Sequence, residues 1–474
     1  MDFEPFTFRS GRRVVARDPT ARRPADVFRL VMRHERRGTA TGRLPRVGPP
    51  VPSSRPMALE DIQDAGRKGD EMTWPWRRER PGAGRIDRLV VQQYDPRRTV
   101  TIGGIVTCLR GVLEYAPPDV ALAVVGVDDS GSTDTRLGRW QVIRRGDRDV
   151  WFLPVARIDG TRRKRFVPYS ARLIAGLLRY RARIPRAASL QAHRVDVGLF
   201  TRLLFRGPLV YCIHTQERGL LGSTSDSFWR FTGSLHERFD RAIARRAERV
   251  IVFNPAYAET VRRWNPRTVS APTWFDPAIT TPAADPAPPA VVWVGRLEPP
   301  KDPELAVRTF DALARSEPAV PWTLEMIGSG SLRPALEVLI ASLPPDVAGR
   351  ITLRGRLAAV DVAEARSRSG VFLMTSHAGY EGFPRVLVEG MAAGLPAVVT
   401  DGADTGGLVQ QGVSGFVCRR DPTELADAIR AARTLDRAKV VDAVAALSAP
   451  RVVREVFFPE STETRVVDTG GEGR

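Results

Sequence analysis

The feature that most constrains the fold of this chain is an alternation of short apolar runs with amphipathic segments of helical spacing. Runs at 88–91, 250–253 and 291–294 are rich in Val, Ile and Leu, which is typical of strands buried on both faces of a parallel sheet. The amphipathic segments between the runs supply the crossovers that parallel strands need. The alternation therefore predicts an α/β fold with parallel sheets.

This alternation occurs twice along the chain and is interrupted once, by residues 271–289. That segment is dense in Pro, Ala, Thr and Asp, a composition typical of a linker. We therefore expect one Rossmann-like domain over 87–270 and a second over 290–435, followed by a terminal helix and tail over 436–474. Two doubly wound domains in tandem are expected to face each other across a central cleft.

The overall charge points to anionic partners. Residues 1–86 show neither the strand nor the helix spacing of apolar residues, and they are rich in Arg, Pro and Gly. This composition predicts a disordered or variable basic extension. The formal net charge of the whole chain is +18, which favours phosphate-bearing substrates, an acidic polymer, a membrane surface or nucleic acid. No motif of interleaved aromatic and basic residues accompanies the charge, so nucleic acid is not the partner we expect.

The cysteines and the N-terminal residues indicate the compartment. Cys108, Cys212 and Cys418 are odd in number and far apart, a spacing that predicts neither a disulfide framework nor a zinc site. Residues 1–8 are acidic and aromatic, unlike a secretory signal. No apolar run approaches the roughly 18 residues of a spanning helix. We therefore expect a cytoplasmic protein that could also lie on the inner face of the plasma membrane.

The most specific pattern lies at residues 376–400. A predicted strand ends, a short loop with glycine carries Glu381, and a helix is expected to begin near Pro384. The free amides of that first turn, together with the positive end of the helix dipole, are suited to hold phosphate. Glu389 follows Glu381 at a helical distance of about 12 Å, at 1.5 Å per residue. One carboxylate could meet the hexose of a nucleotide-sugar while the other meets the ribose.

This segment resembles the E-x7-E signature of retaining glycosyltransferase family 4, with Glu381 and Glu389 as the two acids and Gly382, Phe383 and Pro384 between them. The resemblance covers roughly residues 88–435. It implies the GT-B fold and the transfer of a hexosyl group from a UDP- or GDP-linked donor to a hydroxyl acceptor, with retention of the anomeric configuration. Family members generally need no divalent metal, so we expect neither a metal nor a cofactor.

The resemblance extends to residues upstream of the two glutamates. The run 294–301 is similar to the family's Gly-Arg element, and implies that Arg296 and Lys301 stabilise the departing diphosphate, whose oxygens gain negative charge. Asp302 stands where the family usually has glycine. Glycines after the next strand, and a Gly-Arg-Leu run further along, are implied to lie under the nucleotide and near its base. These donor-site residues are Gly328, Gly330 and Leu357.

In the first half, the resemblance is weaker and rests on strand-end residues. Gly103 and Gly104 follow the first strand, where the family's loop approaches the donor phosphates; an ordinary turn between strand and helix would look the same. His214 matches a strand-end histidine that contacts the transferred sugar, and a structural histidine remains the alternative. His193 resembles the preceding strand-end histidine, for which we expect a role in acceptor binding.

Several alternatives stay open on the sequence alone. The acceptor is expected to be a glycan, a lipid-linked molecule or a polyol-phosphate polymer of the cell envelope. A helix around 171–183 has basic residues that could rest on an anionic membrane or could form the solvated face of a packed helix. A phosphorylase, a nucleotide-sugar hydrolase and a non-catalytic GT-B binding protein with a basic surface are the competing functions. Residues 437–447 are expected to return to the first domain as a terminal helix.

Overall fold

The computed structural model describes residues 86–98, 103–131, 135–158, 169–214 and 233–459, with the side chains of 233–235 excepted. The basic extension predicted over 1–86 lies outside the described residues except for Ile86, and so does the end of the tail from 460. No helix in these described ranges combines the length and the apolar character needed to cross a bilayer.

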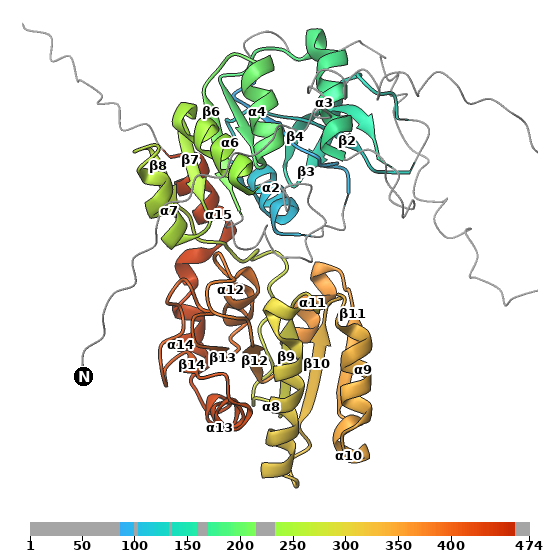
Figure 1. Ribbon diagram of the computed structural model, residues 1–474, viewed down its shortest axis with the longest axis vertical. Coiled ribbons are helices and arrows are strands. Elements are labelled where there is room, and N and C mark those ends of the chain that lie inside the picture. The colour runs from blue at the N-terminus through green and yellow to red at the C-terminus, as the bar shows by residue number, and fades with distance from the viewer. Residues whose placement is uncertain (1–85, 99–102, 132–134, 159–168, 215–232, 460–474) are drawn as a thin grey trace, which may run out of the picture. The chain divides into compact units, whose positions relative to one another are not determined.

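The first sheet contains eight strands among the described residues (Figure 1). They are β1 (Arg88–Val91), β2 (Leu122–Asp128), β3 (Gln141–Arg145), β4 (Arg148–Arg157), β5 (Ser189–Ala192), β6 (Leu209–Ile213), β7 (Arg249–Val252) and β8 (Thr268–Ser270). Their order in the sheet is β3-β4-β2-β1-β5-β6-β7-β8. The strand order reverses at β1, so the crevice at the carboxyl ends of β1 and β5 is the expected ligand site of such a sheet.

One edge of this sheet differs from the wholly parallel arrangement that the sequence predicted. Strand β3 pairs antiparallel with β4, and the other neighbours pair in parallel. The two strands are joined by a tight turn in which Gly146 has φ 53°. Because β3 has the sequence Gln-Val-Ile-Arg-Arg and no buried residue, it lacks the apolar run by which the other strands could be recognised.

Helices cover both faces of the first sheet. One face carries α3 (Tyr169–Tyr180), α4 (Val195–Leu204), α6 (Gly233–Arg246) and α7 (Pro255–Arg262), and the other carries α2 (Gly104–Tyr115). The amphipathic pattern of α2 explains its position, because Cys108, Leu109, Val112 and Leu113 are all buried on the sheet. Helix α2 begins directly behind the loop that carries Gly103, so it places that loop at the carboxyl end of β1.

The second sheet has six strands, all parallel. They are β9 (Ala290–Val294), β10 (Thr323–Ile327), β11 (Ile351–Gly355), β12 (Val371–Met374), β13 (Ala397–Thr400) and β14 (Gly415–Cys418). The order β11-β10-β9-β12-β13-β14 is the doubly wound order of dinucleotide-binding domains. The switch point lies between β9 and β12, where the strand order reverses.

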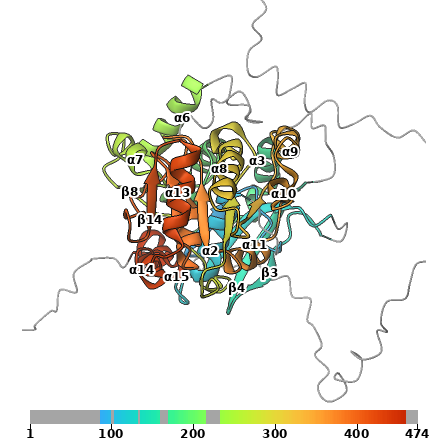
Figure 2. The same cartoon turned by 90° about the horizontal axis from the view of Figure 1, so that it is seen from below.

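The helices of this second lobe are also divided between two faces (Figure 2). One face packs α8 (Pro303–Ser316), α9 (Arg333–Ala341) and α13 (Pro422–Ala432), with the short α10 (Pro345–Ala348) beside them. The opposite face packs α11 (Ala359–Ser367), α12 (Arg385–Ala392) and α14 (Arg437–Asp442). The fold therefore confirms two doubly wound α/β lobes.

The segment that returns to the first lobe is not the one that the sequence predicted. Helix α14 buries Val440 in the second lobe beside α12. The chain instead crosses at Ser448, which bridges to Phe275 of the linker. Helix α15 (Ala449–Val452) and a π-helical turn (Val453–Phe457) then pack against α2. The expectation for 437–447 was wrong because the large apolar side chains of the first-lobe contact, above all Phe457, lie after residue 448.

Candidate nucleotide-sugar site

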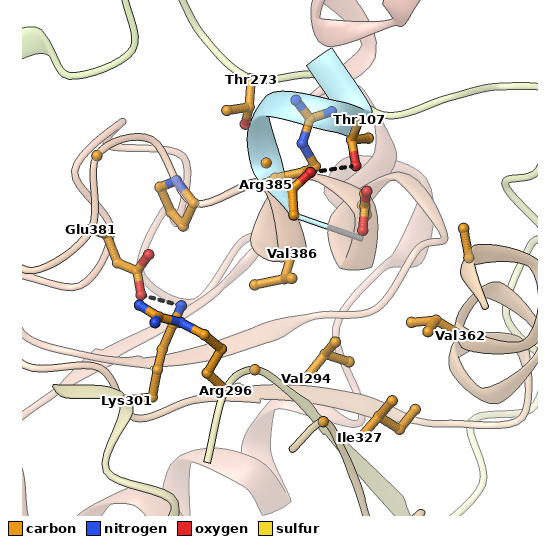
Figure 3. A pocket seen from close by; sticks show the side chains of 18 of the residues that line it. Thr107, Thr273, Val294, Arg296, Lys301, Ile327, Val362, Glu381, Arg385 and Val386 are labelled. Carbon is orange, nitrogen blue, oxygen red and sulfur yellow. Dashed lines mark hydrogen bonds and ion pairs between the residues drawn. The ribbon is translucent and has the colours of Figure 1, made fainter. Parts of the chain in front are cut away.

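A pocket of about 770 Å³ lies where the carboxyl ends of both sheets meet (Figure 3). This size is within the range of ligand pockets, roughly 300–1,000 Å³. The pocket brings together every site residue that the sequence predicted except His193. Those lining residues are Gly103, Gly104, His214, Arg296, Lys301, Gly328, Gly330, Leu357, Glu381, Gly382, Phe383, Pro384 and Glu389.

Glu381 is held in place before any ligand binds. Lys301 forms an ion pair with its carboxylate, and the Ser376 hydroxyl donates to Glu381 Oε1 at 2.6 Å. The Lys301 ammonium also lies 5.8 Å from the centre of the Tyr380 ring. Glu381 itself is buried. A buried carboxylate needs such partners because an unpaired charge there would be strongly unfavourable.

Asp302 accounts for the departure from the family's usual glycine. Its backbone is left-handed, with φ 41° and ψ 63°, in the region that favours glycine. Asp tolerates this region better than most residues, and the Asp302 side chain gains a capping hydrogen bond from Leu305 N at 3.1 Å. Arg420 forms an ion pair with the same carboxylate. The substitution therefore keeps the turn that presents Lys301.

Glu389 also lines the pocket and also forms an ion pair. Arg366 of α11 forms an ion pair with it, and the Arg366 side chain is only 8% exposed. Among the described residues, none accepts a hydrogen bond from Arg366 Nε. The guanidinium is thus close to the pocket with hydrogen-bonding capacity to spare, which suits an anionic or hydroxyl-rich ligand.

Arg385 is a second cation that the sequence reasoning missed. It stands at the first turn of α12, and its Nη1 donates to the Trp274 carbonyl at 3.0 Å. Its guanidinium lies 4.9 Å from the centre of the Trp274 ring. Burial lowers the pKa of Arg385 below its ordinary value. An arginine within the otherwise apolar run 383–388 was the signal available in the sequence.

The glycines of the second lobe leave room for the backbone to turn tightly. Gly328 has φ 147°, and a Cβ there would collide with the Gly295 carbonyl. A Cβ on Gly330 would collide with the Leu297 carbonyl. Ser329 lies between these two glycines, and Arg356 Nη2 donates to its hydroxyl at 3.1 Å. This close packing sets the pocket floor beside β9 and β10.

The loop between β12 and α12 is anchored to a strand end of the first lobe. Asn254 Nδ2 donates to the carbonyls of Glu381 and Gly382, at 3.3 Å and 3.5 Å. A Cβ on Gly382 would lie only 2.8 Å from the Phe253 carbonyl. The backbone of the predicted donor loop and the first lobe are therefore in close contact, and Gly382 is required by that contact.

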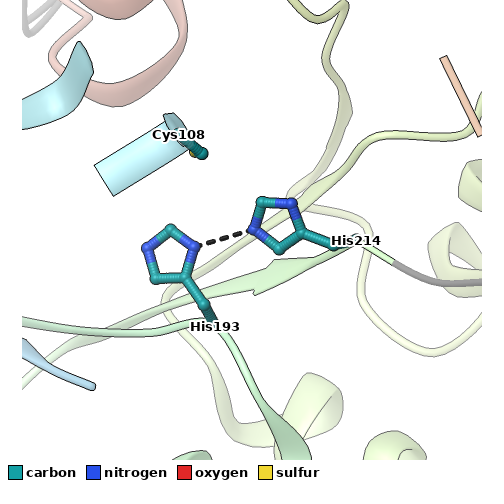
Figure 4. A group of neighbouring side chains, drawn as sticks. All are labelled: Cys108, His193 and His214. Atoms are coloured by element: carbon teal, nitrogen blue, oxygen red, sulfur yellow. Dashed lines mark hydrogen bonds between the residues drawn. The ribbon is translucent and has the colours of Figure 1, made fainter. Parts of the chain in front are cut away.

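His214 lines the pocket, whereas His193 is buried and is not among the lining residues. Figure 4 shows the two rings side by side. The planes of the two rings are 23° apart and their centres lie 5.1 Å apart, and His193 Nδ1 is 2.8 Å from His214 Nε2. Burial lowers the pKa of His193 to about 3 and that of His214 well below its ordinary value, so both are neutral at physiological pH. The expectation that His193 contacts the acceptor is corrected by this position.

Cys108 lies beside the two histidines, and the ligand atoms of all three side chains are within 4.8 Å of one another. The sequence predicted no such group, because these residues are far apart along the chain. Burial raises the pKa of the Cys108 thiol to about 12, which opposes the thiolate that a metal would need. The two imidazoles, in turn, are already hydrogen-bonded to each other.

Comparison with known proteins agrees with this geometry. Residues 288–434 match the family model for glycosyl transferases group 1. A stretch of 154 residues is 30% identical to the D-inositol 3-phosphate glycosyltransferase of Rhodococcus opacus (strain B4). That alignment covers 31% of this chain and spans about a third, 34%, of the relative's length.

Solved structures extend the likeness to both lobes. Sucrose-phosphate synthase from Thermosynechococcus elongatus superimposes with a TM-score of 0.61 at 19% identity, over 78% of this chain and 97% of that one. The Anabaena protein HepE, in complex with UDP and glucose, superimposes with a TM-score of 0.54 at 18% identity, over 78% and 98% of the two chains. The chain thus has the GT-B fold, and its second lobe matches group 1 glycosyl transferases over residues 288–434.

Proposed function

We propose that this chain is a retaining glycosyltransferase that moves a hexosyl group from a UDP- or GDP-linked donor to a hydroxyl acceptor. One observation carries the proposal: a single pocket gathers Arg296, Lys301, Glu381 and Glu389 around the first turn of α12. Cations, paired carboxylates and free helix amides are the groups that a diphosphate flanked by two sugars requires.

Departure of the nucleoside diphosphate is the step in which the cations act. As the glycosidic bond breaks, negative charge grows on the β-phosphate oxygens. Arg296 and Lys301 stabilise that charge in a site that is partly closed to water, and the amides at the start of α12 add their dipole. The Arg296 side chain is positioned for this by its hydrogen bond to the Tyr380 hydroxyl.

The carboxylates divide the two sugars of the donor between them. Glu381, which lines the pocket together with His214, meets the hydroxyls of the transferred hexose. Glu389, paired with Arg366, meets the ribose of the nucleotide, and the base lies over Gly328, Gly330 and Leu357. The retention of configuration rests on the resemblance of residues 376–400 to family 4.

The known relatives narrow the first choice of donor and acceptor. HepE is described in complex with UDP and glucose, so UDP-hexoses are the first donors to test. The R. opacus relative is named for transfer to D-inositol 3-phosphate, an acceptor that combines a polyol with a phosphate. This agrees with the proposal of a glycan, lipid-linked or polyol-phosphate acceptor of the cell envelope.

The same proposal places the protein at the inner face of the plasma membrane. Helix α3 supports it, since Arg172 and Arg179 are exposed and Leu178 between them is 42% exposed. The neighbouring basic run at 162–165 lies outside the described residues. Flotation with vesicles that contain anionic lipid should carry the protein, and Arg172→Gln with Arg179→Gln should abolish flotation; equal flotation of the variant would remove membrane binding from the proposal.

The decisive experiment combines donor binding with turnover. Thermal-shift screening against UDP-, GDP- and ADP-sugars identifies the donor, because a ligand that binds only the folded state raises Tm. Nucleotide release is then measured with and without acceptor, and NMR gives the anomeric configuration of the product. Nucleotide release without acceptor would indicate a hydrolase, and release that depends on inorganic phosphate would indicate a phosphorylase. Donor binding without any release would indicate a non-catalytic protein. A product with inverted anomeric configuration would remove the retaining assignment.

We also propose that transfer needs neither a metal nor a cofactor. The support is the set of side chains that face the diphosphate position, where Arg296 and Lys301 supply the positive charge that Mg²⁺ would otherwise bring.

A further inference from the structure

The residues behind His214 form a polar line across an apolar layer. Along β5 the side chains alternate between the two faces of the sheet, which places Ser189 and Gln191 on the same face. His193, directly after β5, contacts Gln191 on that face. That face packs under α2 with Cys108, Val210 and Cys212, all buried. Gln191 and His193 are themselves fully buried. Polar groups in such a layer are retained at a cost unless every one is hydrogen-bonded.

The hydrogen bonds along this line run in one direction only. Arg88 Nη1 contacts Gln191 Oε1 at 3.4 Å, and an arginine can donate but never accept. The Gln191 oxygen must therefore face Arg88, which leaves the amide nitrogen, a donor, facing His193 Nε2 at 2.7 Å. Burial lowers the pKa of Arg88 to about 10, so it remains protonated at neutral pH.

The direction set at Arg88 fixes both imidazoles. A neutral His193 that accepts at Nε2 carries its proton on Nδ1, and it donates that proton to His214 Nε2 at 2.8 Å. His214 in turn accepts at Nε2 and carries its own proton on Nδ1. This is the reverse of the tautomer that a neutral histidine prefers in water.

We infer that Gln191 and His193 are positioning residues that hold His214 as the Nδ1–H tautomer, so that His214 presents a hydrogen-bond donor to the transferred sugar in the pocket. The line of hydrogen bonds begins at Arg88. The returning C-terminal segment holds Arg88 in place, through the Phe457 carbonyl at 2.7 Å and the Phe458 ring at 4.4 Å. The inference about the tautomer stands on these contacts; its role toward the sugar rests on the proposed function.

The tautomer can be measured without any substrate. The protein has only five histidines, so selective ¹⁵N labelling gives few enough imidazole signals to assign with His193→Asn and His214→Asn. We expect both nitrogens of each buried ring to identify a neutral Nδ1–H form. Gln191→Met, of similar length but without a donor, should shift His214 toward Nε2–H. Gln92→Met is the matched control, since Gln92 is also buried, directly after β1, but lies outside the line.

Kinetics then test the role toward the sugar, with the donor that the thermal-shift screen identifies. Gln191→Met should lower kcat/KM about tenfold, the size of one hydrogen bond lost in the transition state. His214→Asn, whose amide lies near the place of Nδ1, should retain more activity than His214→Gln. Adding Gln191→Met to His214→Asn should then have no further effect.

The outcomes separate the parts of the inference. An Nε2–H or charged His214 in the unaltered protein would overturn it, as would stoichiometric Zn²⁺ that shifts both imidazoles together through Cys108. A full Gln191→Met effect in the His214→Asn background would overturn the role toward the sugar. If no nucleotide-sugar binds at all, the proposed function fails while the NMR result on the tautomer still stands.

Discussion

Lys301 forms an ion pair with Glu381 that joins the turn after β9 to the loop after β12. These are the strands on either side of the switch point of the second sheet, so the pair spans the crevice where a ligand of a doubly wound domain lies. The sequence predicted that Lys301 contacts the diphosphate and that Glu381 contacts the hexose. Because the two side chains are paired, replacing either of them leaves the other without its partner in this ion pair.

Replacing Lys301 with Ala should lower the rate of transfer by about 10²-fold or more, because a cation beside the leaving diphosphate is lost. Part of the loss comes through Glu381, which is left buried without its ammonium partner. The measurement is kcat for nucleotide release at saturating donor. Lys439→Ala, which removes an exposed lysine on α14, is the control. Unchanged turnover in Lys301→Ala would reject the assignment.

Glu389→Ala should weaken nucleotide binding with less effect on kcat. The change removes the expected ribose contact and leaves the buried Arg366 unpaired. Calorimetric titration with the free nucleotide gives the dissociation constant. Glu364 of α11 provides a matched control, because it forms an exposed ion pair with Arg368 and neither residue lines the pocket. Glu364→Ala should leave affinity unchanged, and normal affinity in Glu389→Ala would remove Glu389 from the ribose site.

The sequence predicted the pocket better than the side-chain pairing within it. Glu381, Lys301 and the glycines are part of a local pattern of strand, glycine turn and helix, so they could be assigned one motif at a time. Arg366 could not be found in this way, because its contact with Glu389 joins α11 to α12 and depends on how the two helices pack on one face of the sheet.

Two other features escaped prediction for related reasons. Strand β3 has no apolar run of its own and is held by its hairpin with β4. The pairing of His193 with His214 depends on the neighbouring register of β5 and β6, in which Gln191 lies opposite Val210. The alternating polar residues Ser189, Gln191 and His193 were visible in the sequence. Only the structure shows that Gln191 and His193 are buried under α2, where they must be hydrogen-bonded.

The glycines separate a role in folding from a role in binding. A Cβ on Gly104 meets nothing within 4 Å, so Gly104→Ala at the start of α2 should leave Tm unchanged or slightly raised while it obstructs the ligand. Gly328→Ala should instead destabilise the second lobe, since its Cβ collides with the Gly295 carbonyl. Thermal unfolding and donor titration of both variants check this. A Gly104→Ala variant that binds donor normally would remove that loop from the site.

Activity should be unaffected by chelation. In the proposed site Arg296 and Lys301 meet the charge on the leaving group. Burial raises the pKa of the Cys108 thiol to about 12, which disfavours a thiolate ligand. Nucleotide release is measured after dialysis against EDTA and again after Mg²⁺ or Zn²⁺ is added. A loss of rate that Mg²⁺ restores would show that the diphosphate is neutralised by a metal.

Acid should destabilise the protein through its buried histidines. In the unfolded chain His193 takes up a proton near its ordinary pKa of 6.5, whereas in the folded protein burial lowers that pKa to about 3. Between these values the unfolded state binds more protons, so stability falls as the pH falls. For one such histidine the loss of stability between pH 8 and pH 5 is about 2 kcal/mol.

Denaturant unfolding at both pH values should show that this difference in stability shrinks in His193→Gln. It should stay the same in His377→Gln, which alters an exposed histidine. An equal acid loss in His193→Gln and the unaltered protein would mean that His193 is already charged, with a proton on both ring nitrogens, in the folded state, which the line of hydrogen bonds from Arg88 to His214 does not allow.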